Sequence, residues 1–205
     1  MIVHNKGKYI IYVSEKNDGT AREIPGFIYT KQVHGNNIYL LEQHIDFIDS
    51  ENDGIISNLL NIKIGVLLAD CNGIIIMWEN RYGVIHAWRK WLQNSIIKKA
   101  LDTIQSKGEK ISWLQIYIWP SIRQCCYEVG EEFLWYFDKK YLSKHGWKLY
   151  FDMISNIHDI LIKAWIQKQN IEIHPDCTAC SDKFFSYRKQ NNNQRIVVGI
   201  EKQSI

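Results

Sequence analysis

The stretch from Lys63 to Trp91, KIGVLLADCNGIIIMWENRYGVIHAWRKW, decides the fold. It contains three apolar runs: Ile64–Ala69, Gly73–Trp78 and Tyr82–His86. Runs of about four to eight β-branched and aliphatic residues bounded by Gly, Asn and Asp are typical of buried strands. Asp70 and Cys71 separate the first two runs, and His86 ends the third. Because polar groups at the ends of buried strands need partners, we predict that Cys71 and His86 share a metal ion with His34.

The composition bounds the class of protein. With 205 residues, 46% of them hydrophobic, the chain can form a single domain (1–205) with a sizeable core. A net charge of +3 with scattered Lys and Arg argues against nucleic-acid binding. No apolar run approaches the roughly 20 residues that span a bilayer, and the N-terminal run has no signal-peptide cleavage site, so it is expected to be a first strand. Five cysteines leave one unpaired in any disulfide scheme, which favours reduced thiols in the cytoplasm.

The rest of the chain predicts a mixed β-sheet core flanked by helices, an α/β (α+β) class. Further strands are expected at Tyr9–Val13, Ile24–Thr30, Asn37–Glu42, Ile55–Ser57, Ser112–Ile118, Ile171–His174 and Arg195–Ile200. Asn17–Thr20 contains the Asp-Gly pair that is typical of hairpins. Helical spacing of apolar residues predicts one helix over Lys90–Ile104 and another over Asp152–Gln169, with Asp152 as N-cap and Trp165 on the buried face.

A thiol and two imidazoles are ligands that zinc prefers. Three protein ligands with a fourth position open are typical of a catalytic zinc site, whereas four protein ligands are typical of a structural one. His34, Cys71 and His86 are far apart in sequence, as expected for ligands collected from several strand ends. The alternative is a buried, inert cysteine beside two surface histidines, because free cysteines are commonly buried.

The other four cysteines give a weaker signal. Cys177-Thr-Ala-Cys180 is either half of a structural zinc site or a redox pair. The chain has no second pair at this spacing, and we expect the adjacent side chains of Cys125 and Cys126 to diverge rather than supply two tetrahedral ligands. Isolated free thiols are the simpler interpretation of these four residues.

Eight short motifs follow one another in a specific order. They are Gln32-Val-His-Gly35, Asn52-Asp-Gly54, Ala69-Asp-Cys71, His86-Ala87 with Trp-Arg, Pro120-Ser-Ile122, Cys126-Tyr-Glu-Val129, Cys177-Thr178 and Phe185-Ser-Tyr-Arg188. The series resembles the YfiH/laccase-domain family, once called multicopper polyphenol oxidases and now described as purine nucleoside phosphorylases. The resemblance runs from about Thr30 to Ile205.

The resemblance implies a mixed-sheet fold and a Zn²⁺ site formed by His34, Cys71 and His86, with copper as a less favoured ion. It implies cytoplasmic purine chemistry in a monomer or homodimer. The partners would be phosphate and a purine nucleoside: adenosine, inosine, guanosine or methylthioadenosine. Adenosine would also be deaminated to inosine, which suits zinc because it lowers the pKa of water toward ~7.

Phosphorolysis further needs groups that hold phosphate and orient the site. Lys31, Arg89 and Arg188 flank the matched motifs and are candidate anion contacts. Ser121 is a candidate substrate contact. Asp70 is another, and it is also a candidate partner for a ligand histidine.

The chain departs from the family pattern at three places. The family's HAGWRG is His86-Ala-Trp-Arg-Lys-Trp91, and its Gly-Pro-Ser-Ile is Trp119-Pro-Ser-Ile122 with Arg123 next. The segment that usually precedes QVHG, with a Thr-Arg-Gly-Gly-type motif, is largely absent. Tryptophan in place of glycine fills space that a substrate could use. Buried tryptophans among Trp88, Trp91 and Trp119 would therefore indicate a blocked pocket, and exposed ones a partner-binding surface.

Three other functions fit parts of the pattern. A thiol hydrolase would use Cys71 as nucleophile and His86 as base. Copper-dependent phenol oxidation would need several coppers, whereas one such site holds a single ion. A zinc-stabilised scaffold or partner-binding protein would retain the metal ligands without catalysis. We predict that metal binding is retained and that catalysis depends on an open cleft reaching the metal.

Overall fold

The computed structural model describes residues 1–88 and 96–204. Its first sheet has five strands in the order β1 (Ile2–Lys6), β2 (Tyr9–Val13), β14 (Ile196–Lys202), β6 (Lys63–Leu68) and β3 (Phe27–Ile28). Neighbouring strands are antiparallel except for β3 and β6, which are parallel.

The second sheet has six strands in the order β13 (Ile171–Ile173), β9 (Gln115–Ile118), β7 (Asn72–Met77), β8 (Tyr82–Ala87), β5 (Gly54–Ser57) and β4 (Ile38–Leu41). The outer pairs β13–β9 and β4–β5 are parallel, and the inner pairs are antiparallel. A small third sheet has the order β10 (Glu128–Val129), β12 (Lys148–Phe151) and β11 (Leu142–His145). The prediction of mixed sheets is confirmed.

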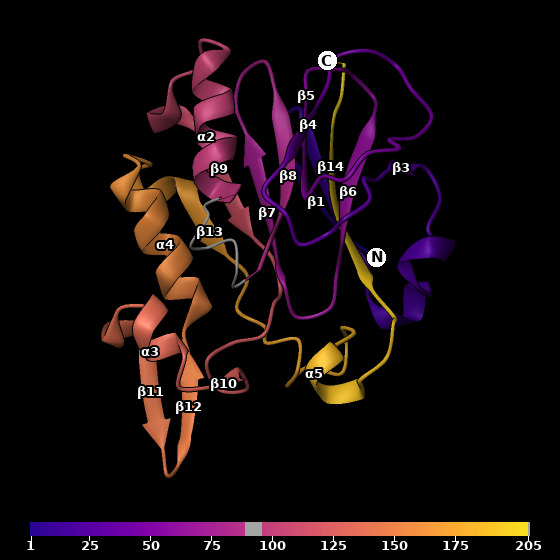
Figure 1. Cartoon of the computed structure of the whole chain (residues 1–205). Helices are drawn as coiled ribbons and strands as arrows, with labels where there is room; N and C mark the ends of the chain where they lie inside the picture. Colours follow the sequence, from indigo (N-terminus) through magenta and orange to yellow (C-terminus); the bar gives the residue numbers. More distant parts are fainter. Residues whose placement is uncertain (89–95, 205) are drawn as a thin grey trace.

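Helices cover one face of the six-stranded sheet, and the five-stranded sheet covers the other (Figure 1). The α-helices are α2 (Ile96–Ser106), α3 (Phe133–Tyr136), α4 (Met153–Lys163) and α5 (Tyr187–Gln190). Short 3-10 helices lie at Lys16–Asp18, Ala21–Glu23, Ile111–Trp113, Lys139–Tyr141 and Lys168–Asn170.

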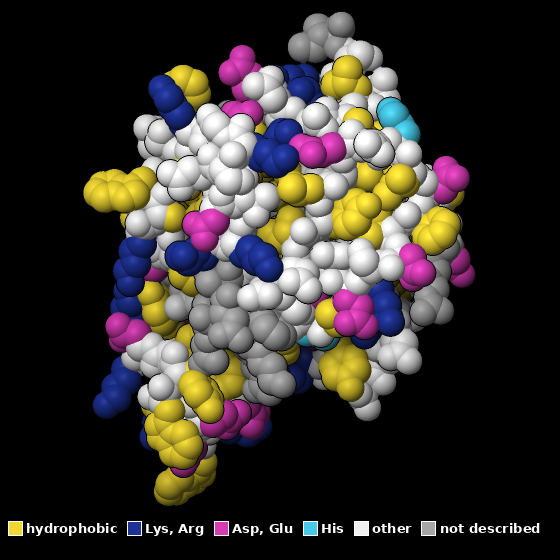
Figure 2. Space-filling model, turned by 45° about the horizontal axis from the view of Figure 1, so that its top comes forward, with side chains coloured by type: hydrophobic (Ala, Val, Ile, Leu, Met, Phe, Trp, Pro, Cys, Tyr) yellow, Lys and Arg dark blue, Asp and Glu magenta, His cyan; other side chains and the backbone are white. Residues whose placement is uncertain are grey.

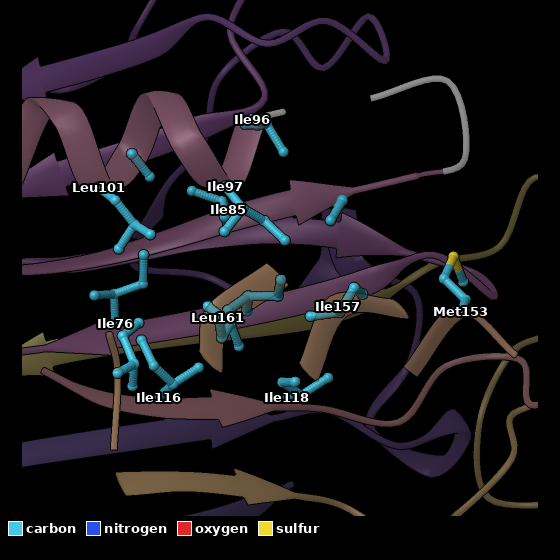
Figure 3. Close-up of a cluster of buried hydrophobic side chains, with 14 of the residues drawn as sticks. Ile76, Ile85, Ile96, Ile97, Leu101, Ile116, Ile118, Met153, Ile157 and Leu161 are labelled. Carbon is cyan, nitrogen blue, oxygen red and sulfur yellow. The ribbon is translucent and has the colours of Figure 1, made fainter. Parts of the chain in front are cut away.

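The alternation of side chains along β7 creates two cores. Ile75 and Met77 pack between the two large sheets, whereas Ile74 and Ile76 face the helical layer. In that second core, side chains from the strands meet Leu101 of α2 and others from α4 (Figure 3). Because both faces of β7 are buried, its sequence is a continuous apolar run rather than an alternating one.

Several predicted elements differ from the structure. The 17–20 turn exists, with Gly19 at φ 88°, but it does not close a hairpin, because β2 pairs with β1 and β14. The helix predicted over Asp152–Gln169 begins as expected, with the Asp152 carboxylate accepting from the Ser155 amide at 3.0 Å, but it ends at Lys163. Trp165 has a φ of 67° and is 84% exposed, so its predicted place on the buried face is wrong. The first part of the Lys90–Ile104 prediction lies outside the described residues, and the rest forms α2.

The surface carries mixed charge and one apolar end. On the face seen in Figure 2, Lys and Arg side chains are interspersed with acidic ones. Hydrophobic side chains project at its lower left, where Figure 1 places β11, β12 and α3, and the exposed aromatic residues of that region are Trp135, Tyr136 and Trp147. Within residues 1–88 and 96–204, no helix has the length and apolarity needed to cross a bilayer.

Candidate active site

The structure brings His34, Cys71 and His86 together, with one ligand atom of each within 4.8 Å of the others. Cys71 lies in the turn where the chain passes from β6 in one sheet to β7 in the other. His86 is on β8, directly opposite Gly73 of β7, and His34 lies in the loop between β3 and β4. Cys71 and His86 are buried, whereas His34 is exposed. The predicted convergence of these three side chains is therefore present in the fold.

Asp53 organises two of the three candidate ligands. It lies immediately before β5 and is completely buried. Its Oδ1 is 2.7 Å from Nδ1 of His86 and accepts the His34 amide at 3.0 Å. Its Oδ2 accepts the amides of Val33 at 3.2 Å and Gly35 at 2.5 Å. One carboxylate thus orients the His86 ring and shapes the loop that carries His34, which sits at a φ of 56°.

The surroundings of this group set the protonation states of its side chains. Burial raises the pKa of Asp53, but hydrogen bonds from His86 and from the loop amides outweigh it and hold the pKa below its usual value. An ionised carboxylate only accepts, so Nδ1 of His86 carries the hydrogen and Nε2 is free to bind a metal. Burial and the nearby His86 lower the pKa of His34, which keeps its imidazole neutral. Burial raises the pKa of the Cys71 thiol, so a cation is needed to stabilise its thiolate.

Asp70 does not orient a ligand histidine, and that prediction is wrong. Its carboxylate accepts the Thr178 hydroxyl at 2.6 Å and the Arg188 amide at 2.7 Å. It has a φ of 85°, unusual for a residue other than glycine, and its carbonyl accepts the Ile122 amide at 3.0 Å. These contacts hold the tight turn that positions Cys71. Asp70 also lines the cavity, so its predicted substrate contact stays a prediction.

An open cavity of about 1090 Å³ reaches all three candidate ligands. Its wall includes Trp88, Tyr127, Tyr187 and two arginines, Arg188 and Arg195. Further lining residues are Thr20, Ala21, Thr30, Gln32, Leu67, Ala69, Asp70, Ile122, Glu128, Val129, Asn193 and Gln194. The altered family motifs therefore leave a cavity at the site.

The tryptophans of those motifs lie in different environments. Trp88 is half-buried against the Tyr127 ring, with centroids 5.4 Å apart, and forms part of the cavity wall. Trp119 is buried away from the cavity, where it packs beside Tyr117 and His174. Trp91 lies outside the described residues.

Only some of the predicted anion and substrate contacts line the cavity. Arg188 lines the cavity, where its guanidinium donates to the Glu128 carbonyl at 3.0 Å. Lys31 is exposed, pairs with Glu51 at 3.2 Å and does not line the cavity. Ser121 is completely buried and accepts a hydrogen bond from Arg123 at 3.3 Å, so it presents no surface to a substrate. Arg89 lies outside the described residues.

Three functional candidates were missed from the sequence. Asp53 lies in the Asn52-Asp-Gly54 motif, which indicates a turn in the sequence. Only its complete burial in the structure shows that its carboxylate has a further role. Gln32 fixes the start of the histidine loop to β6, where it donates to the Leu67 carbonyl at 3.0 Å and accepts the Leu67 amide at 2.7 Å. Arg195 carries no local signal, because it joins the cavity only through the place of β14 in the sheet.

Comparison with known proteins places this arrangement in a family. Residues 15–201 match the family described as "Multi-copper polyphenol oxidoreductase laccase". The chain is 34% identical over 150 residues to a purine nucleoside phosphorylase of Aquifex aeolicus, covering 73% of this chain and 70% of that protein. It is 24% identical over 199 residues to "Adenosine deaminase RL5" from an unknown prokaryotic organism, covering 87% of this chain and 76% of that protein.

Solved structures share the fold. A Neisseria meningitidis protein superposes with a TM-score of 0.83 at 16% identity, covering 99% of both chains. Bacillus licheniformis YfiH superposes with a TM-score of 0.78 at 20% identity, covering 87% of this chain and 74% of that chain.

The fold and the histidine–cysteine–histidine group together define a mixed-sheet protein of the YfiH type with a possible metal site. The chain belongs to the laccase-domain (YfiH) family, as its match over residues 15–201 shows. Relatives carry the names purine nucleoside phosphorylase and, in one case, adenosine deaminase. The donor set fits a zinc ion, since it offers one sulfur and two imidazoles, a carboxylate behind one imidazole, and an open side facing the cavity.

Proposed function

We propose that this protein is a zinc-dependent purine nucleoside phosphorylase of the cytoplasm that also deaminates adenosine. Its substrates would be adenosine, inosine, guanosine or methylthioadenosine, with phosphate as co-substrate. The observation that carries the proposal is the convergence of His34, Cys71 and His86 at a cavity of about 1090 Å³ with aromatic and arginine walls. The names of the relatives support the same chemistry.

The Cys71 sulfur, Nε2 of His86 and the His34 imidazole would hold the zinc ion. When bound, zinc supplies Lewis acidity at the wall of the cavity. Asp53 keeps the hydrogen of His86 on Nδ1, away from the metal, and fixes the His34 loop. Asp70, through Thr178 and Arg188, holds the Cys71 turn. Two buried carboxylates thus position the ligands, Asp53 the two histidines and Asp70 the turn that carries Cys71.

The cavity walls suit the two parts of a nucleoside–phosphate pair. The half-buried Trp88, which packs on the buried Tyr127, offers an aromatic side chain against which a purine can stack, an interaction worth about 1–3 kcal/mol per base. A guanidinium has five N–H donors, and the described hydrogen bonds of the Arg188 and Arg195 guanidinium groups go to backbone carbonyls. Each guanidinium also lies over an aromatic ring, that of Tyr127 or Tyr187. Both side chains are therefore oriented by the protein and keep donors for phosphate oxygens.

The test combines metal analysis with turnover. Protein purified without added metal should contain zinc, and the Cys71→Ala variant should contain about one zinc ion per chain less than the wild type. Adenosine or inosine with phosphate should yield free base and ribose phosphate, and adenosine should also yield inosine, all resolved by chromatography. His86→Ala should abolish these products, whereas His44→Ala, which removes an exposed histidine outside the metal group, should not. Wild-type protein without turnover above His86→Ala would refute the proposal, and copper in place of zinc would refute its metal.

A further inference from the structure

The four cysteines outside the active site meet at one point. Cys125, Cys126, Cys177 and Cys180 each place a sulfur within 4.8 Å of the other three. The Cys180 sulfur is 3.2 Å from that of Cys126 and 3.6 Å from that of Cys125. The expectation that adjacent cysteines diverge is therefore wrong here, because both sulfurs of the Cys125–Cys126 pair point to the same centre.

We propose that these four cysteines bind a single Zn²⁺ ion in a structural site separate from the catalytic one. A tetrahedral ion with zinc–sulfur bonds of about 2.3 Å holds its ligands about 3.8 Å apart. The separation of the Cys125 and Cys180 sulfurs, 3.6 Å, lies close to that value, that of Cys126 and Cys180 is shorter at 3.2 Å, and all four sulfurs lie within 4.8 Å of one another. A cluster of several irons would hold its cysteines farther apart, since bridging sulfides and additional irons lie between them. Four thiolates leave no position open for a substrate, so the role is structural.

The topology explains how two distant loops form the site. Cys125 and Cys126 follow β9, and Cys177 and Cys180 follow β13, the parallel neighbour of β9. Both loops therefore leave the same edge of the six-stranded sheet. The Thr178 amide donates to the Ser121 carbonyl at 3.1 Å, which joins the loops before any ion is bound.

The local backbone is arranged for thiolate ligands. The Arg123 amide donates to the Cys177 sulfur at 3.4 Å, an interaction that stabilises negative charge on sulfur. The Cys180 amide donates to the Cys177 carbonyl at 3.2 Å, which closes a turn that presents both sulfurs of the CxxC pair on one side. Two separate features, the turn and the amide–sulfur bond, thus support the same ligand set.

The ion would also fix one wall of the cavity. The chain runs directly from Cys126 into Tyr127, Glu128 and Val129, which line the cavity. The Arg188 guanidinium donates to the carbonyls of Glu128 and Cys126. Loss of the ion should therefore loosen this wall, raising KM more than it lowers kcat.

The experiment uses the Cys71→Ala protein, in which the catalytic site has lost its thiolate. Protein purified under reducing conditions without added metal should contain about one zinc ion per chain. Replacement of zinc by Co²⁺ should give the strong charge-transfer absorption and visible bands of a tetrahedral four-thiolate site. Adding Cys180→Ser should remove zinc and these bands, whereas Lys183→Ser, an exposed change in the same loop, should leave both.

A second measurement needs no variant. Zinc-loaded wild-type protein should protect all four cysteines together from alkylation, and chelation should expose them together, as read by peptide mapping. Zinc-free Cys71→Ala protein, a cobalt spectrum with fewer thiolates, or a mass that shows disulfides under reducing conditions would each overturn the inference. The active-site proposal would then still stand on the zinc lost with Cys71→Ala. Conversely, a protein without turnover of nucleosides should still give the cobalt spectrum of a four-thiolate site.

Discussion

Replacing Asp53 with asparagine tests how the histidine ligands are positioned. Oδ1 of Asp53 serves the His34 amide and Nδ1 of His86, and Oδ2 serves the amides of Val33 and Gly35. If the asparagine NH₂ group replaces Oδ2, the amides of Val33 and Gly35 face a donor. If it replaces Oδ1, the His34 amide faces a donor, and His86 must accept through Nδ1. Its hydrogen then moves to Nε2, the atom that would bind the metal. No orientation of asparagine satisfies every partner.

The size of the effect follows from these contacts. Each unpaired buried donor costs about 1–3 kcal/mol, and these loop amides are only part-buried. We therefore expect the free energy of unfolding of metal-free Asp53→Asn to fall by about 2 kcal/mol. Zinc affinity, measured by competition with a chelator, should fall roughly 10- to 100-fold, as for other partners of ligand histidines.

Asp70→Asn is the matched control. Asp70 is also a buried carboxylate at the cavity, but its partners are Thr178 and Arg188 rather than a ligand histidine. An asparagine there can still accept the Arg188 amide, and the Thr178 hydroxyl can accept from its NH₂ group. Zinc affinity should therefore fall far less in Asp70→Asn. Equal losses in the two variants would refute the positioning role of Asp53.

The effect should depend on pH in a defined direction. The folded-state pKa of Asp53 lies below its usual value, so its stabilisation is complete above about pH 3.9, the pKa of an unperturbed Asp. The stabilisation is lost as the pH falls through the lower, folded-state pKa. The difference in unfolding free energy between wild type and Asp53→Asn should therefore be largest near neutral pH and shrink below about pH 3.9. A difference that grows on acidification would contradict this assignment.

Four further variants probe packing and substrate binding. Trp165→Gly should raise the free energy of unfolding by about 1 kcal/mol, because Trp165 is exposed at a φ of 67°; Trp165→Ala, which keeps the strain, should not. Gly199→Ala should lower it by about 1–3 kcal/mol, since the new Cβ would lie 2.7 Å from the Ile64 carbonyl oxygen, and an unchanged urea transition would contradict this. Trp88→Ala should raise KM for the nucleoside roughly tenfold through lost stacking, with Trp113→Ala as the exposed control. Arg195→Gln should raise KM for phosphate by about tenfold while KM for the nucleoside changes little.

The central strands could be predicted because their signal is local. The runs at Ile64–Ala69, Gly73–Trp78 and Tyr82–His86 each match β6, β7 or β8 to within a residue at either end. Pairing could not be predicted in the same way. The turn at Gly19 looked like a hairpin, but β2 pairs with β14, whose sequence lies near the other end of the chain.

The candidate site was predictable only in part, for the same physical reason. The three ligand types were visible, but the partner of His86 lies 33 residues away in sequence, and Asp70 beside Cys71 was the nearer and wrong choice. Likewise, the cysteine group depends on the parallel pairing of β9 and β13, which no local pattern in either loop reveals.

The position of β14 has a consequence for biosynthesis. This strand lies between β2 and β6, and Arg195 directly before it lines the cavity. A ribosome makes β14 after every other described strand, so β2 and β6 expose unpaired edges until it emerges. The wall of the cavity that Arg195 forms is therefore completed only after β14 has been made, and a chaperone that shields those two edges would protect the nascent chain.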